Sequence, residues 1–181
     1  MTQYCAFLRG INVGGLKIAM ADLRQFLGEL GLADVRTVLA TGNAVFRAAA
    51  TADALRPMLE TALFARFGYD AQVLLRTREE IAALCRAAGG VTSPEECHLY
   101  VLLCSLGTAA ELEEVFRAEP RERELFQPVG QDAFWVVPKG MTVTTDFGAK
   151  VLGGKRFRFR VTTRNCSTLE RVLREMERVG G

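Results

Sequence analysis

The sequence has few of the residues that build metal sites and hydrolase active sites. It contains one histidine, His98, and five cysteines without a CxxC pair. A zinc site of the usual kind therefore lacks ligands, and a catalytic triad would have to use His98 as its base. Because His98 is flanked by apolar residues of an expected strand, we interpret it as structural. Carboxylate-bound magnesium or calcium is not excluded by this argument.

Long apolar runs are also missing. The first apolar run, Tyr4 to Leu8, ends at Arg9, and no later run approaches the roughly 18 residues of a membrane-spanning helix. We therefore expect neither a signal peptide nor a membrane anchor. An odd number of cysteines in such a chain is typical of reduced thiols, so we expect a cytoplasmic protein without a structural disulfide.

The composition is that of an ordinary globular protein, with 49% hydrophobic and 24% charged residues. The net charge of +2 is unevenly distributed. Residues 1–138 hold 13 basic and 17 acidic side chains, whereas residues 139–181 hold 10 basic and 4 acidic ones. The C-terminal quarter is therefore the basic part of the chain. This moderate positive charge favours acidic partners. The pI of the whole chain is nevertheless below that of a dedicated nucleic-acid-binding protein.

The order of strand and helix patterns predicts an α+β fold with two ferredoxin-like (βαββαβ) parts and a C-terminal helix. We expect the first part at residues 1–90 and the second at 91–181, divided within the Gly- and Pro-containing segment 89–96. Strands are expected at 3–9, 34–40, 43–48, 71–76, 97–104, 124–129, 133–138 and 155–161. The stretch 141–152 has no clear pattern.

Helix starts are indicated by cap residues. Asp53 is expected to cap the helix that follows it. Capping boxes at Thr77 with Glu80, Thr108 with Glu111 and Ser167 with Glu170 predict three more helix starts.

A long motif near the N-terminus resembles a known protein family. The segment Leu8-Arg9-Gly10-Ile11-Asn12-Val13-Gly14-Gly15, with Lys17 and Met20–Arg24, is similar to the domain-of-unknown-function 1697 family (DUF1697). Three later segments fit the same pattern: 35–46, 73–77 and 162–165. The resemblance spans essentially the whole chain and implies a fold of two ferredoxin-like parts. It implies no reaction, substrate or cofactor. The sequence departs from the family pattern at Thr41, where serine is typical, and at Cys166, where tryptophan is usual.

The N-terminal motif predicts a ligand site at one edge of a sheet. Because the first two strands of a βαββαβ unit run parallel, their C-terminal ends share an edge. We expect five polar side chains to converge there, near the backbone amides of Gly10, Gly14 and Gly15: Arg9, Asn12, Lys17, Thr41 and Asn43. Two cations, glycine amides and a nearby helix N-terminus are typical of anion sites. We therefore hypothesise binding of an anionic, phosphate- or carboxylate-bearing small molecule.

The alternative interpretation of this motif is structural. In it, the glycines merely permit positive φ in turns, and Arg9 and Lys17 are solvated. The loop also lacks Gly-Lys-Ser/Thr and GxGxxG, so the cofactor is unknown and no nucleotide class is specified.

A second polar cluster precedes the final helix. Thr163, Arg164 and Asn165 are further candidates for ligand binding, if the two halves dock so that this segment meets the first site. The alternative is simple helix capping by Asn165 or Ser167.

The basic segment Lys155–Val161 supports an alternative function. Period-two alternation predicts a strand with Arg156, Arg158 and Arg160 on one face, which could follow a nucleic-acid backbone. The phenylalanines would then face the core, so no stacking platform accompanies the cations. An ordinary exposed polar face is the alternative, and a protein-interaction module is a third function. Whether the protein is an enzyme is left open. Asp22 is the one plausible base near the glycine loop, with a role towards the helix dipole as the alternative. Cys166 is the most reactive thiol expected, because a nearby arginine and helix start would lower its pKa, and an inert thiol is the alternative.

Overall fold

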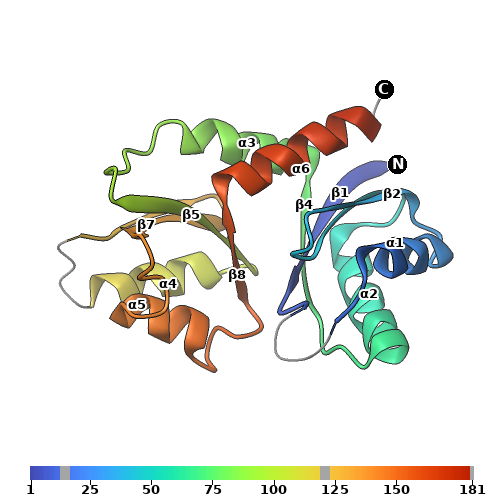
Figure 1. Ribbon diagram of the computed structural model, residues 1–181, viewed down its shortest axis with the longest axis horizontal. Coiled ribbons are helices and arrows are strands. Elements are labelled where there is room, and N and C mark those ends of the chain that lie inside the picture. Colours follow the sequence, from blue (N-terminus) through green and yellow to red (C-terminus); the bar gives the residue numbers. More distant parts are fainter. Residues whose placement is uncertain (13–16, 119–122, 180–181) are drawn as a thin grey trace. The chain divides into compact units, whose positions relative to one another are not determined.

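Two four-stranded antiparallel sheets form the framework of the α+β fold, seen in a computed structural model that describes residues 1–12, 17–118 and 123–179 (Figure 1). The chain divides into two compact units. Unit 1 comprises residues 1–83 and 170–181, and unit 2 comprises residues 84–169. The predicted α+β class is confirmed, whereas the predicted halves 1–90 and 91–181, as separate domains, stay a prediction.

Unit 1 contains a βαββαβ unit. Its elements are β1 (Thr2–Arg9), α1 (Met20–Glu29), β2 (Ala33–Val38), β3 (Asn43–Ala48), α2 (Ala52–Phe67) and β4 (Gln72–Thr77). The strands lie in the order β2-β3-β1-β4, and each neighbouring pair is antiparallel. Helix α3 (Arg78–Ala88) follows β4 directly.

Strand alternation divides the sheet of unit 1 into two faces. Tyr4, Ala6 and Leu8 pack with apolar side chains of α1 and α2 in one buried core. Cys5 and Phe7 project from the opposite face and are also buried. The periodicity of β1 therefore distinguishes a helix-side face from a second face of this sheet.

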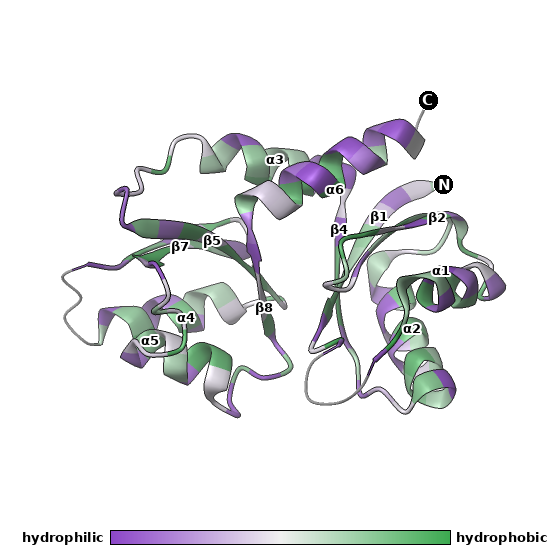
Figure 2. Ribbon diagram, viewed as in Figure 1, coloured by the Kyte–Doolittle hydropathy of each residue, from purple (hydrophilic) through white to green (hydrophobic). Residues whose placement is uncertain are grey.

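The C-terminal part of α6 (Cys166–Val179) belongs to unit 1. The Gln3 amide donates to the Met176 carbonyl at 2.7 Å, and Arg36 pairs with Glu175 at 3.1 Å. In Figure 2 this part of the helix shows purple bands alternating with green ones. The amphipathic helix predicted from the sequence is therefore present, with polar contacts to β1 and β2.

Unit 2 repeats the same topology. Its elements are β5 (Cys97–Cys104), α4 (Thr108–Arg117), β6 (Leu125–Val129), β7 (Asp132–Pro138), α5 (Asp146–Gly148), a π-helix η1 (Ala149–Gly153) and β8 (Val161–Asn165). The order β6-β7-β5-β8 matches that of the first sheet, strand for strand. Trp135, Phe147 and Phe157 are buried in its helix-side core. The stretch without a clear pattern, 141–152, contains α5 and most of η1.

Two predicted local features agree with the structure. Thr77 and Glu80 form the predicted capping box, with Thr77 N donating to Glu80 Oε2 at 2.7 Å and Glu80 N to Thr77 Oγ1 at 3.2 Å. A short turn at 39–42 joins β2 to β3, so the predicted break between two strands here is present, although β2 ends at Val38 and not at residue 40. Both features depend on residues close together in the sequence, so they depend little on tertiary contacts.

Four predicted features are wrong, one of them the cap at Ser167, because α6 already begins at Cys166. Residues 155–160 form turns, with Arg158 N donating to Lys155 O and Arg160 N to Phe157 O, and the strand begins only at Val161. Helix α4 begins at Thr108 with Gly107 as its N-cap, and the Glu111 carboxylate pairs with Arg156 and Arg160 instead of closing a capping box. Helix α2 begins at Ala52 after Thr51, so Asp53 lies inside its first turn.

No helix in the described ranges is long and apolar enough to cross a membrane. The five cysteines, all within those ranges, form no disulfide.

Candidate functional site at the edge of the first sheet

The predicted site lies where β1 and β2 end and β3 and β4 begin. Strands β1 and β2 both pair antiparallel with β3, so they run parallel to each other with β3 between them. Their C-terminal ends therefore share one edge of the sheet, as the sequence predicted. Strands β3 and β4 run in the opposite direction, so their first residues lie at the same edge.

Gly42 allows the 39–42 turn to approach β1 closely. Leu8 N donates to Gly42 O at 2.8 Å. Gly42 has φ +74°, and a Cβ atom there would lie 2.3 Å from Ile11 Cγ2 and 3.0 Å from Leu8 Cβ. Glycine is therefore required at this position by both conformation and space.

Asn12 ties the glycine-rich loop to the same turn. Its amide nitrogen donates to Ala40 O at 3.2 Å, and its Oδ1 accepts from Ile18 N at 2.7 Å. Asn12 has φ +59°, a left-handed conformation that asparagine tolerates better than most residues. The side chain acts as a bridge that sets the loop against the end of β2.

Asn43 plays a similar part inside the sheet. It is fully buried, and its Nδ2 donates to Val38 O at 2.8 Å and to Thr41 Oγ1 at 2.9 Å. Asn12 thus contacts the 39–42 turn, and Asn43 contacts Thr41 in the same turn. Because these hydrogen bonds are made within the protein, the three side chains build the frame of the edge.

The predicted cations and glycines have mixed positions. Arg9 ends β1 and is half-buried, and its carbonyl oxygen accepts a hydrogen bond from the Tyr69 hydroxyl. Lys17 is exposed. Gly10 has φ +74°, and Gly14 and Gly15 lie outside the described residues.

Gln72, which sequence reasoning missed, is the most unusual polar residue at this edge. It is the first residue of β4 and lies directly opposite Arg9 in the β1–β4 ladder. Only 5% of Gln72 is exposed, yet within the described ranges neither its Nε2 nor its Oε1 has a hydrogen-bond partner. Alternation from the buried Val73 and Leu75 would have placed Gln72 on the face opposite the helices, but no local pattern marks its amide as unpaired.

The repeat provides a comparison for Gln72 in unit 2. Two ladder pairs, Leu8–Val73 and Cys104–Val161, pack into the helix-side cores of their units. Gln72 directly precedes Val73, and Arg160 directly precedes Val161. Arg160 is therefore the counterpart of Gln72 in unit 2. Arg160 pairs with Glu111, whereas the Gln72 amide has no partner. The two edges therefore differ in whether their polar group is satisfied internally.

The second predicted cluster lies in unit 2, within β8. Thr163 and Asn165 pair with Leu102 and Tyr100, on the helix side of the sheet. Arg164 pairs with Val101 and so projects from the other face, where its Nη1 donates to Thr162 Oγ1 at 2.8 Å. The segment is a strand whose polar side chains are divided between two faces.

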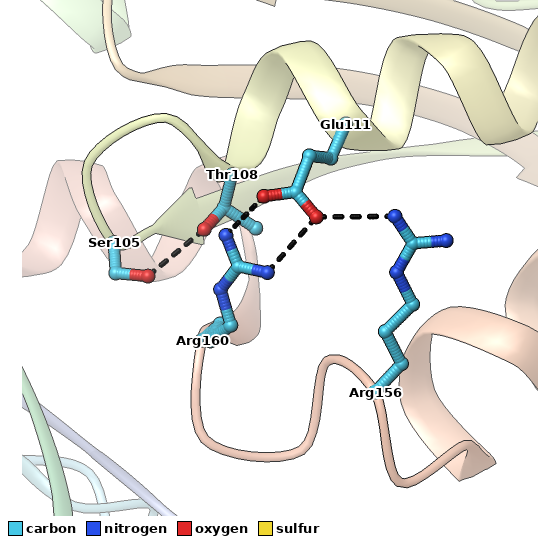
Figure 3. A network of polar contacts seen from close by, with 5 residues as sticks. All are labelled: Ser105, Thr108, Glu111, Arg156 and Arg160. Carbon is cyan, nitrogen blue, oxygen red and sulfur yellow. Dashed lines mark hydrogen bonds and ion pairs between the residues drawn. The ribbon is translucent and has the colours of Figure 1, made fainter.

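The basic segment forms an ion-pair network with α4. Arg156 and Arg160 both bind the Glu111 carboxylate, at 3.2 Å for Arg156 Nη2, while the neighbouring Ser105 and Thr108 hydroxyls bond each other at 2.9 Å (Figure 3). The hydrogen bond from Arg160, and then that from Arg156, lowers the pKa of Glu111 to about 2. The same bond raises the pKa of Arg160. Two of the three predicted nucleic-acid-binding arginines therefore already have a carboxylate partner.

Arg158 has a different environment. Its guanidinium carbon lies 5.2 Å from the centroid of the Phe159 ring, and Phe159 is 50% exposed. The expected separation of aromatic and cationic side chains onto opposite faces is therefore wrong for this pair, because the segment turns instead of extending.

The remaining candidates for chemistry are Asp22, Cys166 and His98. Asp22 is exposed in the first turn of α1. Cys166, half-buried at the start of α6, has its Sγ 3.9 Å from Leu99 O. The centroid of the His98 ring lies 6.0 Å from that of the Tyr100 ring. Within the described ranges, no three His, Cys, Asp or Glu side chains form a group that could hold a metal ion.

The duplicated βαββαβ topology defines an α+β protein made of two ferredoxin-like units. The chain belongs to the protein family of unknown function DUF1697, whose family model matches residues 1–134. Its structure is similar to that of the conserved bacterial protein SP0830 from Streptococcus pneumoniae, with a TM-score of 0.80 and 23% sequence identity. That match covers 98% of this chain and 99% of SP0830, and it establishes the fold alone. No curated protein matches the chain.

Proposed function

We propose that the protein binds an anionic small molecule at the edge of the first sheet, with Arg9 and Gln72 as the contacting residues. The observation that carries this proposal is the buried, unpaired amide of Gln72. A buried polar group without a partner costs about 1–3 kcal/mol. Native proteins rarely keep such groups without a reason, and one such reason is a missing bound molecule.

The neighbour of Gln72 favours an anion as that molecule. Directly opposed residues of an antiparallel pair have Cβ atoms about 4.5–5.5 Å apart and project from the same face, so Arg9 and Gln72 are neighbours. A guanidinium matches the geometry of carboxylate and phosphate groups. The Gln72 Nε2 adds a second donor beside it. Together they supply the charge and the directed donor that an oxyanion requires.

The other predicted residues have supporting parts in this proposal. Asn12, Thr41 and Asn43 hold the loop and the turn in place through the hydrogen bonds described above. Lys17, exposed at the end of the loop, adds positive charge that attracts an anion from solution. Thr163, Arg164 and Asn165 belong to unit 2, and their contribution to this site stays a prediction. The proposal is for recognition without a chemical step.

The proposal is tested by thermal unfolding with simple anions. Phosphate, methyl phosphate, acetate and sulfate are compared at equal ionic strength with sodium chloride. A ligand at 100 times its Kd stabilises the folded state by about 2.7 kcal/mol. Each kcal/mol raises the midpoint by about 2–4 °C for a chain of this size. We expect a saturable increase with at least one oxyanion.

Variants then locate the binding. Arg9→Ala should abolish the increase, whereas Arg56→Ala, which removes an equal charge from the exposed surface of α2, should leave it unchanged. Equal behaviour of the two variants, or no saturable increase with any oxyanion in the wild type, would contradict the proposal.

Nucleic-acid binding is a second candidate function, favoured by the contact between Arg158 and the exposed Phe159. A cation beside an exposed aromatic ring resembles the stacking surfaces that bind single-stranded nucleic acids. In this case a single-stranded RNA should bind with strong salt dependence, and Phe159→Ala should weaken it. Arg158→Ala should reduce the salt dependence, while Arg9→Ala should have no effect. A protein-interaction module is the third candidate, because unit 2 exposes apolar side chains such as Leu106, which is 86% exposed. Binding of neither the oxyanions nor the RNA would favour this third function.

A further inference from the structure

We infer that the site selects an oxyanion that carries its own hydrogen-bond donor, such as a singly protonated phosphate monoester, over an oxyanion that has acceptors only. This inference rests on the proposed function and concerns the same site. It derives from the two ends of the Gln72 amide, because both of them lack a partner among the residues that the structure describes.

The two atoms of the amide require different ligand atoms. Nε2 is a donor and can bind any anionic oxygen, whereas Oε1 is an acceptor and needs an N–H or O–H group. A sulfate ester has no proton to donate, so its oxygens would leave Oε1 unpaired or face it directly. A phosphate monoester that retains one proton donates its O–H to Oε1 and accepts from Nε2. One amide can thus distinguish two anions of equal charge and similar shape.

Arg9 sets the preference for an anion over a neutral amide. A neutral ligand with both a donor and an acceptor would also satisfy Gln72, but it would gain little from the adjacent guanidinium. An acceptor-only anion would pair with Nε2 and gain from the charge of Arg9, but it would leave Oε1 unpaired. An anion that carries one donor pairs with both ends of the amide and gains from the same charge, so it is the class of ligand that these residues fit best.

Entry to the site requires a local opening. Both amide atoms are closed to solvent, so a ligand reaches them only after a covering group has moved. An unpaired buried amide favours this opening, since exposure to water restores its hydrogen bonds. The apparent affinity is then reduced by the small population of the open form, so the titrations should extend to high ligand concentrations.

The test compares methyl phosphate with methyl sulfate at about pH 5, below the second phosphate pKa of about 6, where each ester carries a single negative charge. We expect methyl phosphate to bind wild-type protein about tenfold more tightly, the effect of one hydrogen bond to a buried acceptor. The preference should decrease at about pH 8, where the phosphate ester loses its proton. Affinities are taken from the thermal midpoint and from calorimetric titration.

Gln72→Met is the decisive variant, because it keeps the length of the side chain and removes both polar atoms. We expect the two esters to bind this variant equally. Gln25→Met, on the exposed face of α1, is the matched control and should keep the preference. If Gln72→Met does not fold, Gln72→Glu serves instead. Its carboxylate repels anions and should abolish binding of both esters.

The outcomes separate the two proposals. Equal affinities of the two esters for the wild type would overturn this inference and leave anion binding intact. A preference that persists in Gln72→Met, or binding that is unchanged in Gln72→Glu, would also overturn it. Absence of binding by either ester or by the other oxyanions would overturn the proposed function itself.

Discussion

Gln72 lies directly opposite Arg9 in the β1–β4 ladder, buried to 5% exposure, and neither end of its amide has a partner in the described part of the chain. The cross-strand pair joins a cation to an unsatisfied donor and acceptor at the edge where β1 ends. Because such an amide destabilises the unliganded protein, the pair has consequences for stability as well as for binding.

Gln72→Met should therefore stabilise the protein in the absence of ligand. The substitution replaces an unpaired buried amide with an apolar group of similar length, which removes a cost of about 1–3 kcal/mol. The thermal midpoint should rise by about 2–4 °C per kcal/mol, measured in chloride buffer without oxyanions. Gln25→Met, at a solvent-exposed position, should have little effect. A lower midpoint for Gln72→Met would mean that the amide is satisfied in solution.

Gly42→Ala should destabilise the protein strongly. The new Cβ atom would lie 2.3 Å from Ile11 Cγ2 and 3.1 Å from Leu8 O, at a φ of +74°. Gly10 is the matched control, because it has the same φ and a Cβ atom added there would meet no other atom within 4 Å. Gly10→Ala should show the conformational cost alone, about 1–3 kcal/mol. Urea unfolding should give a larger loss for Gly42→Ala, and equal losses would show that the turn can move away from β1.

Asn43→Ala should reduce stability without changing ligand selectivity. Its buried Nδ2 donates to Val38 O and Thr41 Oγ1, so truncation leaves a buried carbonyl without this donor. We expect a loss of about 1–3 kcal/mol in urea unfolding. Thr41→Val, which removes one acceptor and keeps the shape, should cost less. If Asn43→Ala abolished the preference for methyl phosphate at unchanged stability, the assignment of Asn43 to the frame would be wrong.

Glu111→Gln should weaken unit 2 in a pH-dependent manner. Hydrogen bonds from Arg160 and Arg156 lower the pKa of Glu111 from 4.5 to about 2 in the folded protein. The ion pairs therefore contribute their full stability above about pH 4.5, and this contribution is lost as the pH falls towards 2. The midpoint difference between wild type and Glu111→Gln should be largest at neutral pH and decrease across that window.

The control for this experiment is Glu113→Gln on the same helix. Glu113 pairs with Arg117, whose side chain is largely exposed, so its removal should have a small effect at every pH. A constant midpoint difference for Glu111→Gln from neutral pH to about pH 2 would contradict the expected role of its carboxylate.

The sequence was informative where the signals were local. The capping box of Thr77 and Glu80 and the short connection between β2 and β3 involve neighbouring residues, and both are present in the structure. The alternation in Lys155–Val161 is equally local but was misleading. A polar–apolar alternation fits turns as well as a strand, and Glu111, distant in sequence, attracts Arg156 and Arg160 towards α4. A pattern of polarity alone cannot report such a partner.

The N-terminal motif predicted which segments meet at the edge but not what each side chain does there. Asn12 and Asn43 were expected to bind a ligand; both make hydrogen bonds within the frame, and contact with a ligand stays a prediction. Gln72 was not recognised, because a glutamine at the start of a strand is usually solvated. Its importance depends on the groups that surround it, and those are brought together only in the folded chain.

The sequence by itself determined the family, the α+β class and the repeated order of strands and helices, because periodicity, glycine positions and caps act over a few residues. The tertiary structure alone decided which polar groups are satisfied. Strand pairing places Gln72 beside Arg9, and the Gln72 amide has no partner among the described residues. Its counterpart in unit 2, Arg160, pairs with the carboxylate of Glu111. Hydrogen-bond satisfaction depends on contacts between residues far apart in the chain, so no local pattern encodes it.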